Sequence, residues 1–554
     1  MFKYSSNMPS SKSTSSRRGF LQSTLTTGAV VALRPALSAA REITSPSKSP
    51  TPELKPFDLD EITMSELQNG MKSGRFTAHS LAEKYLQRID EIDKRGPGIN
   101  AVIELNPDAL SIADALDRER KAKGPRGPLH GVPVLIKDNI DTGDRMMTTA
   151  GSLALLGSKA SKDSFVAQKL RAAGAMILGK TNLSEWANAR SSHSISGWSG
   201  RGGLTRNPYA LDRNACGSSS GTGAGISANL AAAGIGTETD GSIVCPSSAN
   251  GLAGIKPTVG LVSRAGIIPI SHTQDGAGPM CRTLRDAAIV LGALTGVDPE
   301  DSATAASAGE SQTDYAQYCD PNGLKGARIG VARKYMGFSD AVDLLMEQSF
   351  DVMKKQGAIL IDPANIETHG KFDDSEGLIL SYEIKADLAA YLARLGPGAP
   401  VKTLKDVIEF NDRNRDKEMP YFGQDLLIKA EARGPLTEKA YLDAVAKARQ
   451  LAGVEGVDAT MDKYHLDAIV GPTGGPAWLI DLLNGDHFGG GSSNAAAVAR
   501  YPNISVTMGS VSGLPVGISF FGRAWSEPTL IKIAYSFEQA TKAREVPKFL
   551  PSIG

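Results

Sequence analysis

Two stretches rich in glycine and serine constrain this chain most, and a segment of small residues separates them. The first reads CGSSSG at residues 216–221, and the second reads GTETDGS at residues 236–242. Glycine lets a backbone approach a ligand closely and turn its N–H groups towards it. Such N–H groups can stabilise an oxyanion, and the serines supply hydroxyl groups for nucleophilic attack. We therefore predict that the two stretches form an active site, with a closely packed helix over 224–233 between them.

Other patterns overlap the first stretch. Residues 217–221 fit G-x-S-x-G, the nucleophile elbow of α/β-hydrolases, but that elbow needs a strand leading into it. The preceding residues, 205–214, read as a polar loop that contains Pro208. Residues 223–228 fit a dinucleotide fingerprint and lack the same strand. A flexible Ser/Gly linker is the third alternative, and the apolar runs on both sides argue against it.

Spacing and a third motif connect the chain to a known family. Ser242 follows Ser218 by 24 residues, and GVPVLIKDN at residues 131–139 places Lys137 after a short apolar run. Together these motifs resemble the amidase signature family of serine hydrolases, in which the two catalytic serines have this spacing. The resemblance extends from about residue 57 to the C-terminus. The local sequences at 198–203 and 238–246 are most similar to those of the bacterial peptide amidases.

The resemblance implies roles for particular residues. Ser242 would be the nucleophile, Ser218 the bridging serine and Lys137 the base. The oxyanion hole would consist of backbone N–H groups of Thr239, Asp240, Gly241 and Ser242. Lys137 must be neutral to act as a base, so we expect burial at the end of its strand to lower its pKa well below the usual value of about 10.4.

Some neighbouring residues compete for these roles. Lys180 also follows an apolar run, and pattern alone makes it an equal candidate for the base, so only the resemblance selects Lys137. Ser219 and Ser220 are interpreted as support for the loop. Cys216 and Cys245 are interpreted as small buried packing residues rather than nucleophiles, and whether they pair is left open.

The chain departs from the family pattern at two positions. The family's common form has Gly-Gly-Ser-Ile-Arg at the nucleophile, where this chain has Asp240 at the first position and Val244 at the last. Glu238 stands where the family commonly has Asp. A supporting Arg–Asp pair is therefore absent, which leaves open what holds the oxyanion loop.

Short apolar runs alternate with helical patterns along the chain, which predicts an α/β layered fold. The predicted strands are residues 132–136, 175–180, 327–331, 467–472 and 516–520, and the predicted helices include 166–173, 341–355 and 527–541. No composition break after residue 57 indicates a linker. We predict a single large α/β/α domain over 57–554, with a mixed and mostly buried central sheet as the resemblance implies.

The N-terminus reads as a targeting signal. Arg17 and Arg18 precede a weakly apolar run over 21–33, which is too short and polar to span a bilayer, and small residues end at Ala40. We interpret residues 1–40 as a twin-arginine signal peptide and the Ser/Pro-rich residues 41–56 as a linker. The alternative is a disordered tail with a chance arginine pair. The signal predicts a periplasmic or secreted protein.

Composition excludes several kinds of partner. The chain has 60 basic and 60 acidic residues, so it lacks the positive charge that nucleic-acid binding requires. Its 4 cysteines and 7 histidines show no metal-ligand spacing, and we expect no metal and no cofactor. No long apolar helix for membrane docking is present in the sequence.

These observations predict hydrolysis of a carboxamide through an acyl-enzyme. We expect the substrate to be a small molecule or a short peptide amide, which is converted to the acid and ammonia. Internal peptide bonds should stay uncut, because a pocket closed behind the amide nitrogen would exclude a continuing chain. The alternatives are an amidase for aryl or aliphatic amides, a glutamyl-tRNA amidotransferase A-type subunit, and a non-catalytic binding protein. The export signal argues against the second, and the retained Lys137, Ser218 and Ser242 argue against the third.

Overall fold

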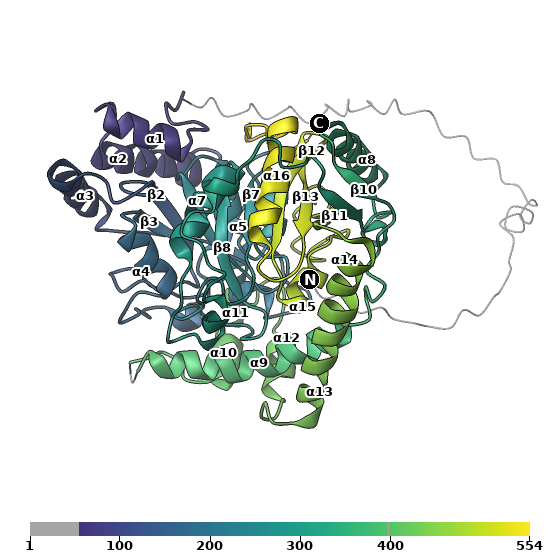
Figure 1. Ribbon diagram of the computed structural model, residues 1–554. Helices are drawn as coiled ribbons and strands as arrows, with labels where there is room; N and C mark the ends of the chain where they lie inside the picture. The colour runs from purple at the N-terminus through teal and green to yellow at the C-terminus, as the bar shows by residue number, and fades with distance from the viewer. Residues whose placement is uncertain (1–54, 397, 554) are drawn as a thin grey trace, which may run out of the picture. The chain divides into compact units, whose positions relative to one another are not determined.

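A mixed β-sheet runs through the computed structural model, which describes residues 55–396 and 398–553 (Figure 1). The predicted signal peptide and most of the predicted linker lie outside the described residues. In order across the sheet, the eleven strands of the described residues are β1 Val102–Leu105, β3 Met176–Thr181, β2 Pro133–Lys137, β6 Ala233–Glu238, β8 Gly276–Cys281, β7 Ala253–Lys256, β12 Asn503–Val511, β13 Leu514–Phe521, β11 Ala468–Pro472, β9 Arg328–Val331 and β10 Ile359–Ile361. A separate pair consists of β4 Trp198–Ser199 and β5 Gly203–Leu204.

Strand β2 lies between β3 and β6 and is parallel to both. Ile136 pairs with Lys180 on one side and with Ile235 on the other. All three strands are buried along their whole length. Burial on both faces explains why β2 and β3 read as short apolar runs, whereas β6, with Thr237 and Glu238, does not read as one and was not predicted. Since parallel strands end at the same edge of a sheet, Lys137 emerges beside the residues that follow β6.

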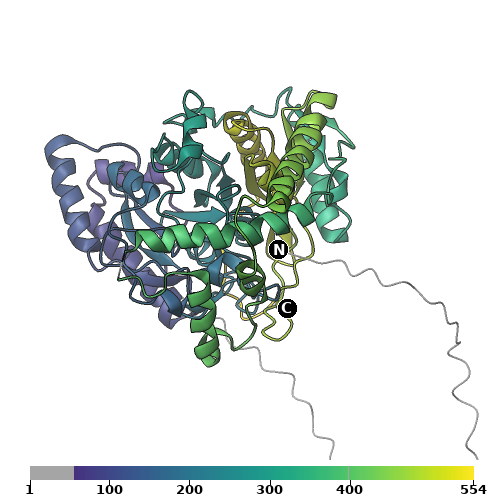
Figure 2. The ribbon, with the colours of Figure 1, turned by 90° about the horizontal axis from the view of Figure 1, so that it is seen from below.

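Helices flank the sheet, and Figures 1 and 2 show them on both of its faces. The α-helices are α1 Met64–Lys72, α2 Ala78–Arg88, α3 Ala109–Lys123, α4 Phe165–Ala172, α5 Ser220–Ser227, α6 Val244–Ala249, α7 Leu284–Leu294, α8 Asp340–Lys355, α9 Asp373–Arg394, α10 Leu404–Arg413, α11 Arg415–Glu418, α12 Asp425–Glu431, α13 Lys439–Ala448, α14 Ala459–Tyr464, α15 Asn494–Ala499 and α16 Glu527–Thr541. Short 3₁₀ or π segments are Ile89–Arg95, Leu153–Leu155, Glu185–Asn188, Ser302–Ser307, Ala316–Tyr318, Arg333–Tyr335 and Arg449–Asp458.

Helix α9 crosses the lower end of the sheet in Figure 1 and faces the viewer in Figure 2. It contacts loops near the carboxyl end of β2. Tyr391 donates a hydrogen bond to Asp141, 2.8 Å away, and Glu383 accepts hydrogen bonds from Ser271 and Thr273. The helix therefore covers the end of the sheet at which Lys137 lies.

The α/β class, the mixed sheet and each predicted strand are confirmed, but the helix expected over 224–233 is wrong. Helix α5 begins at Ser220 and ends at Ser227, and Ala233 already belongs to β6. Glycine is a poor helix former, so the sequence favoured the alanines. Tertiary contact overrides this preference, because a Cβ atom on Gly221 would lie 2.3 Å from a carbonyl oxygen of Ala101.

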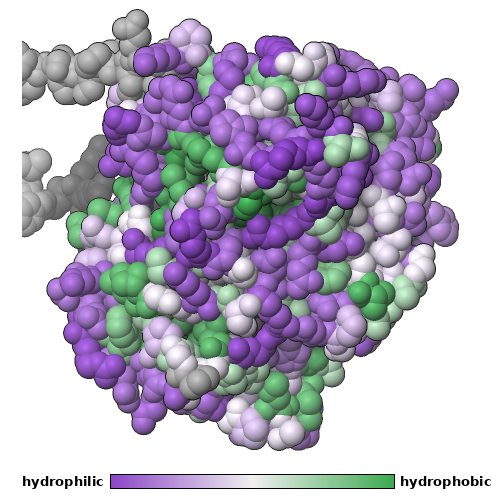
Figure 3. Space-filling model, turned by 90° about the vertical axis from the view of Figure 1, so that its left-hand side faces the viewer, coloured by the Kyte–Doolittle hydropathy of each residue, from purple (hydrophilic) through white to green (hydrophobic). Residues whose placement is uncertain are grey.

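Hydrophobic residues on the surface are scattered in small groups. Figure 3 shows the side that lies at the left of Figure 1, where hydrophilic residues predominate and hydrophobic residues form several separate patches. Within residues 55–396 and 398–553, no helix combines the length and the apolar character that a membrane span requires.

Candidate active site

Lys137 is the last residue of β2, and its side chain is fully buried. Its Nζ atom lies 2.7 Å from Ser218 Oγ, 2.9 Å from Thr237 Oγ1 and 3.3 Å from the carbonyl oxygen of Thr237. Parallel pairing of β2 and β6 brings Thr237 to this position. The structure thus brings together the lysine and the first serine that the sequence singled out.

Burial lowers the pKa of Lys137 to about 7, although the carboxylates of Asp275 and Glu238 oppose the shift. A neutral amine has two N–H bonds and one lone pair. The Thr237 carbonyl can only accept, and Thr237 Oγ1 also accepts a hydrogen bond from Asn139 Nδ2 at 3.0 Å. If both N–H bonds point to Thr237, the lone pair of Lys137 faces the hydroxyl of Ser218.

Ser218 lies just before α5 and is fully buried. The Gly217–Ser218 peptide bond is cis. The carbonyl of Ser218 accepts a hydrogen bond from the N–H of Ser184 at 3.1 Å, and a Cβ atom on Gly217 would lie 2.4 Å from the Ser184 hydroxyl. Glycine at 217 therefore permits the close approach of the Ser184 loop.

The two following serines support the loops. Ser219 Oγ donates to the carbonyl of Thr237 at 3.1 Å, and its backbone N–H donates to the carbonyl of Ser242 at 3.3 Å. Ser220 Oγ donates to the carbonyl of Cys216 at 2.5 Å. These contacts agree with the interpretation of both serines as support, and they join the first stretch to the second.

Ser242 follows Gly241, whose φ of +78° lies in the left-handed region that glycine tolerates. The Ser242 side chain is buried to a lesser degree than Ser218, with 8% of the residue exposed. Within the part of the chain that the structure describes, no hydrogen bond joins the two serine side chains. Among the described residues, the backbone N–H groups of 239–242 donate none of the hydrogen bonds between loops.

Glu238 holds the end of this loop. Its Oε2 atom accepts hydrogen bonds from the backbone N–H groups of Ile243, at 2.7 Å, and Val244, at 3.0 Å. Next to it, Thr239 Oγ1 donates to Asp275 at 2.6 Å. Glu238 therefore supports the loop directly, which answers the question raised by the missing Arg–Asp pair.

Cys216 and Cys245 form a disulfide, with their Cα atoms 6.0 Å apart. Both are buried, which agrees with their interpretation as packing residues, and the disulfide settles the pairing that the sequence left open. One cysteine precedes Ser218 by two positions and the other follows Ser242 by three. The bond therefore joins the two stretches covalently, and this flanking arrangement was the available signal in the sequence.

Lys180, the alternative base, is buried in the neighbouring strand but contacts neither serine. Its Nζ atom donates to the carbonyl of Ile140 at 2.5 Å and to Thr148 Oγ1 at 3.0 Å. Ile136 of β2 pairs with Lys180, whereas Lys137 pairs with Thr181. The one-residue offset directs the two lysines to opposite faces of the sheet.

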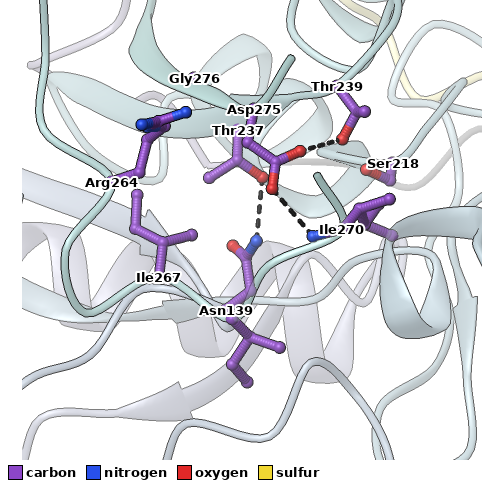
Figure 4. A pocket seen from close by; sticks show the side chains of 11 residues that line it. Asn139, Ser218, Thr237, Thr239, Arg264, Ile267, Ile270, Asp275 and Gly276 are labelled. Carbon is purple, nitrogen blue, oxygen red and sulfur yellow. Dashed lines mark hydrogen bonds between the residues drawn. The ribbon is translucent and has the colours of Figure 1, made fainter. Parts of the chain in front are cut away.

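A small cavity lies beside Ser218, and Figure 4 shows its lining. Asn139, Thr239 and Asp275 contribute polar groups, and isoleucines contribute part of the wall. Burial raises the pKa of Asp275 to about 6. Sequence reasoning missed Asn139 and Thr237, although both lie in the motifs that were recognised. Asp275 has no local signal, because only tertiary packing brings it to the site.

Among the described residues, His272, Glu383 and Asp387 form a group whose ligand atoms lie within 4.8 Å of one another. His272 Nδ1 lies 2.9 Å from Asp387, and Glu383 accepts a hydrogen bond from Tyr441 at 2.7 Å. The His272–Asp387 contact attaches the loop before β8 to α9, and the Tyr441–Glu383 hydrogen bond attaches α13 to α9.

The fold and this lysine–serine arrangement define the amidase class, and comparisons with known proteins agree. The Amidase family matches residues 80–531. A probable amidase of Arabidopsis thaliana is 42% identical over 503 residues, which cover 89% of this chain and 93% of that protein. The native peptide amidase of Stenotrophomonas maltophilia is 49% identical, with a TM-score of 0.85 and coverage of 89% of this chain and 99% of that chain.

A structure of the peptide amidase PAM with the competitive inhibitor chymostatin is 50% identical, with a TM-score of 0.85 over 89% of this chain and all of that chain. The chain therefore belongs to the amidase signature family. It is a hydrolase of amides.

Proposed function

We propose that this protein hydrolyses the C-terminal carboxamide of short peptides to the free acid and ammonia, through an acyl-enzyme on Ser242. The contact between the buried Lys137 Nζ and Ser218 Oγ, at 2.7 Å, carries the catalytic part of this proposal. The substrate class is supported by the identity of 49–50% with peptide amidases.

Acylation begins at Ser242. Its hydroxyl transfers a proton to Ser218 as its oxygen attacks the carbonyl carbon, and Ser218 transfers its own proton to the lone pair of Lys137. Collapse of the tetrahedral intermediate breaks the C–N bond, and the proton returns through Ser218 to the leaving nitrogen. General base catalysis of this kind contributes about 10²–10⁴-fold to the rate.

The negative charge of the intermediate develops on the former carbonyl oxygen. The unpaired backbone N–H groups of Thr239, Asp240, Gly241 and Ser242 are the proposed donors to it. Glu238 keeps the neighbouring N–H groups of Ile243 and Val244 turned away. Because such donors are held in place before the reaction, they stabilise the transition state without reorganisation.

Ammonia release from a panel of amides tests this proposal. The panel contains a dipeptide amide, benzamide and a long-chain fatty amide, and the Ser242→Ala protein serves as the inactive control. We expect the highest kcat/KM with the dipeptide amide and no cleavage of its internal bond. A higher kcat/KM with the fatty amide, or products cut internally, would overturn the substrate assignment.

We also propose export by the twin-arginine route, with residues 1–40 as the signal, 41–56 as a linker and 57–554 as the amidase domain. The Cys216–Cys245 disulfide supports this proposal, since disulfides persist in oxidising compartments such as the periplasm. Replacing Arg17 and Arg18 with lysine should retain the protein in the cytoplasm. Equal amounts of both forms in the periplasmic fraction would contradict the proposal.

A further inference from the structure

Asp240 stands at one of the positions where the chain departs from the family pattern, and the proposed mechanism uses only its backbone. Its side-chain Oδ1 atom is inaccessible to solvent and has no hydrogen-bond partner within the described part of the chain. Asp240 precedes Ser242 by two positions, so their Cα atoms are at most about 7 Å apart. A buried carboxylate oxygen without a partner is costly, so this atom calls for a group that donates hydrogen bonds.

Hydrogen bonds on one side of Asp240 lead to helix α9. Its neighbour Thr239 donates to Asp275 at 2.6 Å, as Figure 4 shows. Gln274, the residue before Asp275, donates through Nε2 to Glu376 Oε1 at 2.9 Å. Glu376 belongs to the first turn of α9 and is 5% exposed. This side therefore places a second, buried carboxyl group near the oxyanion loop.

Contacts on the other side of the same loop lead to the same turn of α9. Gly241 approaches Ser493, because a Cβ atom on the glycine would lie 3.2 Å from Ser493 Oγ. The next residue, Asn494, donates to Asp373 Oδ1 at 3.2 Å. Asp373 precedes Glu376 by three positions, so the two side chains are neighbours on the helix surface. The contacts thus close a ring that runs from the oxyanion loop through α9 and back.

The carboxyl groups of this ring have no cation to compensate them among residues 55–396 and 398–553. The partners of Asp373 and Glu376 are neutral amides, and the buried Lys256 donates to backbone carbonyls instead. Burial and the neighbouring charge of Asp240 raise the pKa of Glu376 to about 8. A cation bound here would lower that pKa, keep Glu376 ionised and gain charge-assisted hydrogen bonds.

A buried hydroxyl faces the same place. Tyr335 is 4% exposed, and its hydroxyl has no hydrogen-bond partner in the described residues. Burial raises the pKa of this phenol well above its usual range, and the carboxylates of Asp240 and Asp373 raise it further. The hydroxyl therefore lies near both carboxylates but donates to neither, which leaves a space between them. An ammonium group, with three N–H donors, matches two carboxylates and a phenol oxygen.

The distance from Ser242 to this space suits a short peptide amide. Two extended residues span about 6–7 Å, from the N-terminal nitrogen to the carbon that Ser242 attacks. The side chain of a lysine in the last position covers a similar span. Asp373 is exposed, whereas Glu376 is buried, so the space is accessible from the side of Asp373.

We propose that this space is a subsite for an ammonium group of the substrate, lined by Asp240, Tyr335, Asp373 and Glu376. The ammonium belongs either to the N-terminus of a short peptide amide or to the side chain of a lysine amide. The inference rests on the proposed function and adds a feature that selects among peptide amides. It also gives the Asp240 side chain a role of its own, at a position where the family's common form has glycine.

Two matched pairs of substrates test the subsite and distinguish the two sources of charge. Glycyl-phenylalaninamide is compared with its glycolyl analogue, in which a hydroxyl replaces the ammonium. N-acetyllysinamide is compared with N-acetylnorleucinamide, which has no ammonium. At pH 7 most of the amino groups are charged. We expect kcat/KM of the wild type to be about 10–100-fold higher for the charged member of at least one pair, the usual contribution of hydrogen bonds to a charged group.

Variants without one charge connect the effect to the subsite. Glu376→Gln keeps an oxygen that can accept from Gln274, and it should bring the ratio of charged to neutral substrate towards one. Asp240→Asn should do the same, and it retains the backbone N–H group of the proposed oxyanion hole. Asp374→Asn is the matched control, because Asp374 is exposed on the same turn of α9, and the ratio should not change.

The outcomes separate the inference from the proposed function. Equal kcat/KM within both pairs for the wild type overturns the subsite while amidase activity remains. A ratio that persists in both Glu376→Gln and Asp240→Asn also overturns it, as does an equal fall in Asp374→Asn, since the effect would then come from the overall charge of the protein. A wild type that hydrolyses none of these amides, charged or neutral, would instead refute the proposed function, and this inference with it.

Discussion

The Nζ atom of Lys137 lies 2.7 Å from the hydroxyl of Ser218, and both side chains are inaccessible to solvent. The same nitrogen contacts both oxygens of Thr237, at 2.9 and 3.3 Å. If its two N–H bonds point to Thr237, the neutral amine has its remaining lone pair on the side of Ser218. Asn139 contributes by donating to Thr237 Oγ1 and so keeps that hydroxyl in place.

Replacing Lys137 with alanine should lower kcat/KM by about 10²–10⁴-fold, the usual contribution of a general base. Lys180→Ala is the matched control, because Lys180 is equally buried but bonds to Ile140 and Thr148 rather than to a serine. Ammonia release from a dipeptide amide measures both variants. A larger loss in the Lys180 variant would transfer the role of base to that residue.

Ser242→Ala should lower turnover by at least about 10⁴-fold, since the nucleophile and its partners act as a unit. A fluorophosphonate should label the peptide that contains Ser242 in the wild type and leave the variant unlabelled. Ser220→Ala serves as the control, because its hydroxyl bonds only to the carbonyl of Cys216. Label on Ser219 or Ser220 would refute the assignment.

Glu238→Ala should lower kcat by about 10²-fold with a small effect on KM, the typical cost of disturbing an oxyanion hole. The carboxylate fixes the N–H groups of Ile243 and Val244 through a single oxygen. Glu238→Gln retains an oxygen at that place and should lose much less activity. If the Gln and Ala variants fall equally, the negative charge rather than the hydrogen bonding of Glu238 is what matters.

The sequence allowed prediction of β2 and β3 because each is a short, fully buried and mostly apolar run, but not of β6, which carries Thr237 and Glu238. Its motifs also led to Lys137 and Ser218, which the structure places in contact, while the role of Ser242 stays a prediction. The contacts that the sequence did not predict are those between residues far apart in the chain. Asp275 accepts a hydrogen bond from Thr239, which is 36 positions away in the sequence. Thr237 contacts Lys137 only because β2 pairs with β6.

The misplaced helix has the same origin. Intrinsic preference puts a helix on the alanines after residue 224, yet Gly221 of α5 packs so closely against the backbone of Ala101 and Asn182 that a Cβ atom would not fit. The helix propensities of single residues contain no information about such close packing between distant segments. The disulfide was likewise left open, since two cysteines 29 residues apart give no distance in space.

The Cys216–Cys245 bond closes a loop of 29 residues, for which the chain-entropy relation gives a stabilisation of about 3.6 kcal/mol. Replacing both cysteines with serine should lower the free energy of unfolding by about this amount, as urea titration would measure. Activity should fall as well, because the bond joins the stretches that carry Ser218 and Ser242. Replacing the free Cys281 with serine and the free Cys319 with alanine tests the effect of losing thiols alone. An unchanged midpoint in the double Cys216/Cys245 variant would contradict the prediction.

The lowered pKa of Lys137 links activity to pH. Burial sets this pKa to about 7, and only the neutral amine accepts a proton from Ser218. We expect kcat/KM with an uncharged dipeptide amide to rise between pH 6 and pH 8, with a midpoint near 7. A profile that stays flat over this range would show that Lys137 does not titrate there.

The same proton links stability to pH, and the sign follows from the two pKa values. In the unfolded chain Lys137 titrates near its ordinary value of 10.5, whereas burial lowers this pKa to about 7 in the folded protein. Between these values the unfolded chain binds the extra proton, so the free energy of unfolding of the wild type rises with pH. The penalty is complete well below pH 7, disappears well above pH 10.5, and amounts to on the order of 5 kcal/mol.

Lys137→Met removes this titration and keeps a side chain of similar length. The wild type should therefore gain stability relative to the Met variant as the pH rises from 7 to 10, by on the order of 3–4 kcal/mol. Lost hydrogen bonds to Ser218 and Thr237 shift the difference by a constant and do not change its slope. Urea unfolding of both proteins at pH 7, 8, 9 and 10 measures that slope, and the titration of Lys180 cancels because both proteins contain it. Parallel curves would mean that Lys137 keeps its ordinary pKa in the folded protein, and the base would then have to be sought elsewhere.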